Sequence, residues 1–175
     1  QSDWHIYYQF YLWLGMCITT GIRPPSTRKN ALQDKHVVAK KGFTILKREN
    51  MKGISYEAVC LPSFLHYYNE ALRLKKEYKV KSPYLICHLQ DSGRKVKGES
   101  ILDFRKQKEH MLEKLELPVF TRPYEFRDYY ITHQIDKGIP PIQVARSCGT
   151  SLNEIDRVYY RKKLTDEASI LMSDN

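Results

Sequence analysis

Four residues of the chain carry groups suited to cleaving a phosphodiester through a covalent protein intermediate. Arg23 follows an apolar run that ends in Thr-Thr-Gly, and Arg127 stands near the start of a later helical stretch. A guanidinium can bind two phosphate oxygens at once, and it binds them more tightly as charge builds in the transition state. Lys52 on a turn can protonate a leaving 5′ oxygen, and Tyr159 can attack phosphorus and retain the bond energy as phosphotyrosine. The residue set therefore indicates chemistry on a phosphodiester.

Each of these residues, taken alone, has an ordinary structural explanation. An arginine before prolines is usually solvated, a lysine on a turn is usually a surface residue, and a tyrosine on an amphipathic helix usually belongs to the core. Neighbours also compete for two of the roles. Lys47 and Arg48 are rivals of Lys52, and Tyr160 is the rival of Tyr159. Only the combination and its order along the chain favour a site.

The pattern of apolar residues predicts a chain that is mostly helical. The first helix is expected over 3–19 with one broad apolar face, ended by Gly21 and by the prolines that follow Arg23. The further helices are expected over 63–77, 101–115, 124–136, from the Pro-Pro pair at 140 to Gly149, and from a capping signal at Thr150 or Ser151 to about 164.

Two short strands are predicted in the N-terminal third. "GFTILKREN" and "SYEAVCLP" alternate in character, and the segment with Gly53 between them is typical of a hairpin turn. Residues 31–38 are ambiguous, and "SPYLICHL" fits either a strand or an apolar turn. The fold class is therefore α+β, mainly helical, with one small antiparallel sheet. No glycine-rich loop follows a strand, which argues against a dinucleotide-binding or P-loop fold.

Composition narrows the class of partner. The chain has 175 residues, 42% hydrophobic and 28% charged, which fits one globular domain, and its formal net charge of +9 favours a polyanion such as nucleic acid. The aromatic-rich segment 6–20 is too short for a membrane span. The four cysteines are too far apart in sequence for metal-ligand spacing, and two of them lie in apolar runs that predict buried thiols. We expect a reducing, cytoplasmic compartment and neither metal nor cofactor.

Three segments resemble the catalytic domain of the tyrosine recombinases, the phage integrase family. "TTGIRPPST" resembles the first conserved box, and "YEFRDYYITHQIDKGIPPIQVARSCGTSLNEIDRVYY" resembles the second. Between them, "MKGISYEAVCLP" is similar to the lysine hairpin of the family. The segments occur in the order of the family, and the resemblance covers about the whole chain.

The resemblance implies a role for six residues. Arg23 and Arg127 match the two arginines, Lys52 the hairpin lysine, and Tyr159 the nucleophile, ten residues after Gly149. Tyr124 stands where the family usually has histidine, and Thr150 where it usually has histidine or tryptophan. Both can donate a hydrogen bond to a phosphate oxygen, but neither can act as an imidazole near pH 7. Asp128 also replaces a common histidine. These departures imply slower chemistry or assistance from another group.

The resemblance further implies a fold, a reaction and partners. Residues 1–175 would be the catalytic domain, with an N-terminal core-binding domain outside this sequence. The reaction would be site-specific strand exchange on double-stranded DNA through a 3′-phosphotyrosyl link, in a homotetrameric synapse inside the host cell of a phage or mobile element. The segment 165–175, with its apolar cluster of Ile170, Leu171 and Met172, would dock on a neighbouring protomer.

Two alternatives stay open. A relative that binds DNA without cutting it would explain the missing histidines. A basic helical interaction domain would make the motif matches coincidental, and Arg23, Lys52, Arg127 and Tyr159 would then not converge in the fold.

Overall fold

The computed structural model describes residues 4–24, 27–49, 53, 55–116 and 124–157. Lys52, Tyr159, Tyr160 and the segment 165–175 lie outside the described residues, and so do the predictions that fall on them. No helix among the described residues has both the length and the apolar character that a membrane crossing requires.

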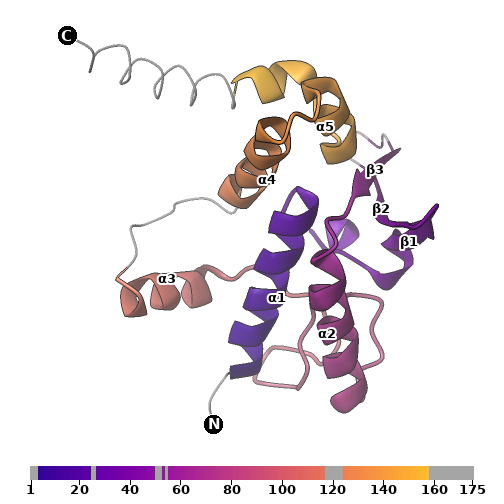
Figure 1. Cartoon of the computed structure of the whole chain (residues 1–175). Coiled ribbons are helices and arrows are strands. Elements are labelled where there is room, and N and C mark those ends of the chain that lie inside the picture. The colour runs from indigo at the N-terminus through magenta and orange to yellow at the C-terminus, as the bar shows by residue number, and fades with distance from the viewer. Residues whose placement is uncertain (1–3, 25–26, 50–52, 54, 117–123, 158–175) are drawn as a thin grey trace.

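The described chain is mainly helical and carries one three-stranded antiparallel sheet in the order β1-β2-β3 (Figure 1). The predicted fold class is confirmed. The elements are α1 (Trp4–Thr20), η1 (Arg28–Asn30), η2 (Asp34–His36), β1 (Val37–Lys40), β2 (Phe43–Glu49), β3 (Ser55–Val59), α2 (Phe64–Glu77), α3 (Arg105–Lys114), α4 (Tyr124–Asp136) and α5 (Pro141–Cys148). Residues 152–157 form a further helical turn.

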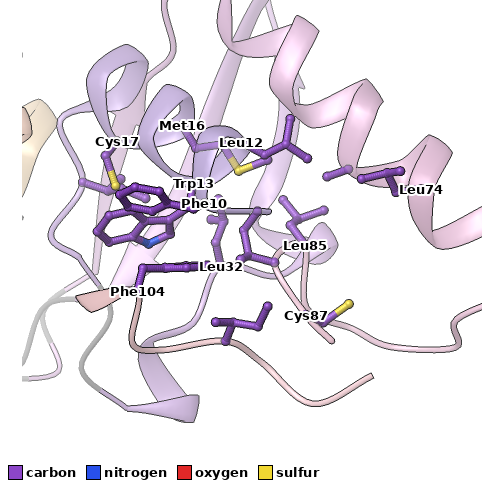
Figure 2. Packing of buried hydrophobic residues seen from close by; sticks show 14 of the residues in the cluster. Phe10, Leu12, Trp13, Met16, Cys17, Leu32, Leu74, Leu85, Cys87 and Phe104 are labelled. Atoms are coloured by element: carbon purple, nitrogen blue, oxygen red, sulfur yellow. The ribbon is translucent and has the colours of Figure 1, made fainter. Parts of the chain in front are cut away.

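Helix α1 is the central element of the fold. It packs against α2, α3 and α4, and Figure 1 shows α4 near its C-terminal end. Because three helices contact it, its buried residues extend around much of the helix, whereas the sequence predicted a single broad face. Trp4, Tyr7 and Tyr11 remain exposed at 47%, 37% and 44%. In Figure 2, Phe10 and Trp13 of α1 lie beside Phe104 in the main core.

The sheet adds one strand that the sequence left ambiguous. β1 pairs with β2, and β2 pairs with β3, so that Leu46 lies between Val37 and Ala58. Leu46 and Ala58 are fully buried. The end of β3 is tied to the C-terminal helices, because Ser147 Oγ of α5 accepts a hydrogen bond from the amide of Val59 at 3.0 Å. The sheet and the C-terminal helices therefore meet at β3.

Arg48 on β2 fixes the segment that follows the first arginine. Its side chain is buried, and its Nη2 donates to the carbonyl of Asn30 at 2.6 Å while its Nη1 donates to that of Ala31 at 3.4 Å. Nδ1 of His36 accepts from Arg48 Nη1 at 3.3 Å and from the amide of Gln33 at 3.1 Å, so the ring is neutral with its hydrogen on Nε2. Arg48 is thereby committed to holding residues 30–36 on the sheet.

We expect the neutral His36 ring to make stability depend on pH. Burial, with Arg48 and Lys35 close by, lowers the pKa of His36 from 6.5 to about 4. As the pH falls, His36 therefore takes up a proton in the unfolded chain before it does so in the folded chain. The stability that the neutral ring contributes is complete above pH 6.5 and is lost as the pH falls toward 4. After discounting for partial exposure, the loss is about 1–2 kcal/mol. Urea unfolding at pH 7 and pH 4.5 should show this difference, and His36→Gln should reduce it.

One sequence expectation needs correction, and one open alternative is resolved. The helix predicted over 101–115 begins at Arg105, because Ile101 donates its amide to Ile86 and buries its side chain in the core. "SPYLICHL" is an apolar turn region with isolated bridges at Tyr84 and Cys87, and it forms no strand of the sheet.

Candidate active site

The two arginines of the predicted site lie close together at the end of α1. Gly21 follows the helix with a φ of +62°, and its carbonyl accepts a hydrogen bond from Arg127 Nη1 at 2.7 Å. Arg127 projects from α4 across a sequence separation of more than a hundred residues. The helix end that positions Arg23 therefore also anchors Arg127.

A close approach of α4 to α1 makes this contact possible. A Cβ atom at Gly21 would lie 2.3 Å from the ring of Tyr130, which is far below any van der Waals distance. Tyr130 in turn donates its hydroxyl to the carbonyl of Val59 at 3.1 Å. Only glycine satisfies both the positive φ and the ring contact at this position.

Arg127 is a buried cation in a strongly perturbed setting. Its side chain is only 4% exposed. Burial lowers the pKa of Arg127, and the nearby charge of Arg23 lowers it further, while Cys148, Tyr56 and Tyr124 act in the opposite direction. The group still stays protonated near neutral pH, because an arginine guanidinium keeps its charge in proteins. A buried cation, Arg127, thus lies near a second, half-buried cation, Arg23.

Donor groups on both arginines lack protein partners. Nη2 of Arg127 and Nε of Arg23 are buried and hydrogen-bond to no described residue. A buried charged donor without a partner costs about 1–3 kcal/mol or more. An anion placed between the two guanidinium groups would satisfy these donors and offset their mutual repulsion. The arrangement therefore has the chemistry of a site for an anion.

Tyr124 lies near Arg127, and Thr150 lies at the end of α5 beside Gly149. Tyr124 is the first residue of α4, 45% exposed, and close enough to Arg127 to influence its pKa. Thr150 follows Gly149, the left-handed cap of α5, and its amide donates to the carbonyl of Ala145 at 3.0 Å. The hydroxyls of Tyr124 and Thr150 are the groups expected to assist phosphate binding, and those roles stay predictions.

Two further residues of the site were not anticipated from the sequence. The ring of Tyr56 on β3 packs on Gly149 so closely that a Cβ there would lie 2.6 Å from it, and Tyr56 also acts on the pKa of Arg127. Glu154 bonds to Arg157 at 2.6 Å, and the charges of Arg23 and Arg127 also lower its pKa. Both residues lie inside the motif segments quoted above, but neither was assigned a role in the site.

The remaining sequence candidates are placed as follows. Lys52 and Tyr159 lie outside the described residues, so their roles stay predictions. Arg48 is held by backbone carbonyls, whereas Lys47, its neighbour on β2, is exposed. Asp128 influences Arg157, and the Arg127 guanidinium turns instead to the carbonyl of Gly21. Among the described residues no three His, Cys, Asp or Glu side chains gather in a way that would hold a metal ion.

We expect sulfate, as a phosphate mimic, to stabilise the protein through the two arginines. At 50 mM sulfate and a dissociation constant in the low millimolar range, binding adds about 1–1.5 kcal/mol, or about 3 °C in Tm. Sulfate also stabilises proteins generally, so the measurement is the increment relative to Arg23→Gln. Arg73→Gln, a change on α2, should retain the full increment. An equal rise in Arg23→Gln would contradict anion binding at this site.

Comparisons with known proteins identify solved structures that share the fold of this chain. No family model and no curated protein sequence matches the chain. Among solved structures, XerH recombinase in a post-cleavage complex with a palindromic difH substrate matches with a TM-score of 0.69 and 19% identity, over 98% of this chain and 48% of that one. XerA recombinase matches with a TM-score of 0.63 and 14% identity, over 91% of this chain and 57% of that one.

The Tn1549 transposon integrase, in complex with circular intermediate DNA, gives a similar result. Its TM-score is 0.62 at 14% identity, covering 91% of this chain and 56% of that one. The chain thus has the fold of the tyrosine recombinase catalytic domain, as the sequence resemblance implied. It spans about half the length of these structures.

Proposed function

We propose that this chain is the catalytic domain of a site-specific DNA recombinase that cuts and rejoins strands through a 3′-phosphotyrosyl intermediate. A core-binding domain N-terminal to it would complete the grip on the duplex, and four protomers would assemble on two DNA sites. The fold shared with DNA-bound recombinases and integrases supports the class of substrate.

One observation carries the proposal. Arg127 is buried, holds only one hydrogen bond to the described chain, and lies close enough to a second cation, Arg23, for that charge to lower its pKa. Such a pair is unfavourable in the free protein and becomes favourable when a dianionic phosphorane forms between its members. Arg48 differs in degree, because it donates to two backbone carbonyls and leaves only its Nε without a partner in the described chain.

The proposed reaction follows from these groups. The Tyr159 hydroxyl loses its proton to water and its oxygen attacks the scissile phosphorus. The bond from phosphorus to the 5′ oxygen breaks, and that oxygen takes a proton from Lys52. Arg23 and Arg127 bind the non-bridging oxygens, assisted by hydroxyl donors of Tyr124 and Thr150. The 5′ hydroxyl of a partner strand then gives its proton to the neutral Lys52 and attacks the phosphorus. The bond from phosphorus to the Tyr159 oxygen breaks, and that oxygen regains a proton from water, which restores Tyr159 and conserves the phosphodiester.

Trapping of the covalent intermediate tests the proposal. Full-length protein is mixed with nicked duplexes that carry candidate attachment sequences, so that the short cleaved end diffuses away and cannot religate. After denaturation, we expect protein joined to DNA in the unsubstituted protein and in Tyr160→Phe, and none in Tyr159→Phe. An adduct lost only in Tyr160→Phe would move the nucleophile by one residue.

A second function remains in view because of Tyr124 and Thr150. Neither side chain can transfer protons as an imidazole does, so a relative that binds DNA without cutting it has a physical basis. For this second function, we expect strong, salt-dependent binding of DNA. No covalent adduct should form, even on a duplex that the protein is shown to bind specifically.

A further inference from the structure

The hydroxyl of Tyr130 lies in a cluster of apolar side chains. Tyr130 is 3% exposed, and the other buried residues of its cluster are Ile131, Val144, Ala145, Cys148 and Ile155. A buried hydroxyl without a hydrogen bond is costly, and a phenylalanine ring would fill nearly the same volume. The bond from this hydroxyl to the carbonyl of Val59 is therefore the feature that phenylalanine could not supply.

The last residue of β3 is held by side chains at the side where a further strand would pair. β3 lies at the edge of the sheet, and the ladder bond at this end runs from the amide of Cys60 to the carbonyl of Thr44. The amide and the carbonyl of Val59 therefore point away from β2. The amide donates to Ser147 Oγ of α5 at 3.0 Å, and the carbonyl accepts from Tyr130 of α4 at 3.1 Å. Both outward groups of this residue are bound.

Tyr130 also contacts the element that positions the arginines. Its ring lies against Gly21, whose carbonyl accepts the hydrogen bond of Arg127. Burial raises the pKa of Tyr130 to about 12, and nearby Ser147 lowers it only in part. The hydroxyl therefore remains protonated near neutral pH and can donate. One side chain thus joins the arginine site, through its ring, to β3, through its hydroxyl.

β3 is held at a second point near its other end. The ring of Tyr56 packs on Gly149, the cap of α5. Because Tyr56 and Val59 both contact the C-terminal helices, the direction of β3 relative to Arg127 is fixed. Lys52, the proton donor of the proposed reaction, comes shortly before β3 in the sequence. A few residues of chain have a short reach, so the placement of β3 limits where Lys52 can act.

We propose that Tyr130 is a positioning residue for the leaving group of the reaction: its hydroxyl fixes β3, and β3 fixes the origin of the segment that carries Lys52. The inference rests on the proposed function. The ring and the hydroxyl have separate roles, because the ring packs on the anchor of Arg127 and the hydroxyl binds the strand. A displacement of about 1 Å in a catalytic group can cost about 10²-fold in rate.

A change of leaving group tests this role. Full-length Tyr130→Phe, which retains the ring, is given nicked duplexes with either an ordinary scissile phosphodiester or a 5′-bridging sulfur. The sulfur can leave as a thiolate, because a thiol has a pKa of about 8.5, whereas the 5′ oxygen needs a proton. We expect Tyr130→Phe to cleave the phosphodiester about 10–100-fold more slowly and the sulfur substrate within about threefold of the unsubstituted protein.

Tyr8→Phe is the matched control. It removes a tyrosine hydroxyl that joins α1 to α2 by a bond to Glu70 at 3.0 Å, away from the arginine site, so both rates should be unchanged. A loss of stability alone would slow both substrates equally. In Tyr130→Phe the sulfate increment should be retained, because the Gly21 carbonyl still holds Arg127.

Amide hydrogen exchange measures the fixing of β3 without any cleavage. We expect the peptide that covers 55–61 to exchange at least about 10-fold faster in Tyr130→Phe, with α2 unchanged. Ser147→Ala, which removes the acceptor of the Val59 amide, should have the same effect.

The outcomes are distinct. Equal slowing on both substrates, unchanged exchange in β3, or loss of the sulfate increment in Tyr130→Phe would overturn the positioning role. If the unsubstituted protein forms no adduct on either duplex while exchange in β3 rises as expected, the fixing of β3 by Tyr130 stands and the cutting function fails. If the adduct forms at the same rate in Tyr130→Phe, the cutting function stands and the positioning role fails.

Discussion

Arg127→Met is expected to abolish covalent capture of DNA while leaving the stability of the fold within about 1 kcal/mol of the unsubstituted protein. Removing one donor to a developing oxyanion costs about 10²–10³ in rate, and the loss of a full bidentate cation should cost at least about 10³. The buried cation, however, is poorly compensated in the free protein, and methionine fills a similar volume without the cost of desolvation. Loss of the bond to the Gly21 carbonyl offsets that gain.

Arg48→Met is the matched control for this prediction, because Arg48 is also buried but donates to two backbone carbonyls. Leaving those carbonyls unpaired should cost about 2–4 kcal/mol in the free energy of unfolding. Urea denaturation compares the stabilities, and single-turnover cleavage of nicked duplexes compares the rates. A loss of stability as large in Arg127→Met as in Arg48→Met would mean that Arg127 is structural.

Gly21→Ala is expected to destabilise the protein by about 2–4 kcal/mol and to weaken the arginine site. The alanine would need a φ near +62°, and its Cβ would meet the Tyr130 ring at 2.3 Å. The backbone term is about 1 kcal/mol, and forcing α4 away from α1 adds about 1–3 kcal/mol. Since the Gly21 carbonyl holds Arg127, displacement of the helix also moves the guanidinium, and the response to sulfate should fall.

Gly93→Ala separates the two terms. Gly93 has a φ of +58°, and a Cβ there would meet nothing within 4 Å. The free energy of unfolding of Gly93→Ala should therefore fall only by the cost of the positive φ, and its response to sulfate should be unchanged. Equal unfolding free energies for the two alanine variants would show that the contact of Gly21 with Tyr130 has no energetic weight.

The helices were largely predictable from the sequence, because glycine and proline determine where they end. Gly149 ends α5 with a left-handed residue as expected, and Ser151 resolves the open choice of cap by accepting the amide of Glu154 at 3.2 Å. β1 was not predictable, since residues 37–40 become a strand only through pairing with β2. Ile101 likewise lies outside α3, because its amide donates a hydrogen bond to the carbonyl of Ile86, which is distant in sequence.

The arginine site was predictable only in part. The convergence of Arg23 and Arg127 followed from the order of motifs, and the structure brings both to the end of α1. The sequence could not show which of Lys47 and Arg48 is buried. The side chains of a strand alternate between its two faces, and the pairing register determines which residues the buried side chain contacts. Tyr56 was missed for the same reason, since its contact with Gly149 depends on how β3 meets α5.

The most direct test of the central claim, that the two arginines hold a scissile phosphate for attack by a tyrosine, is to locate the covalent link itself. The adduct from nicked duplex is digested with protease, and the peptide that retains nucleotide is sequenced by mass spectrometry. We expect a single link, from Tyr159 to a 3′ phosphate, whose yield falls at least about 10³-fold in Arg127→Met. A link at a residue distant from the arginine site, or one whose yield is unaffected by Arg127→Met, would contradict the claim.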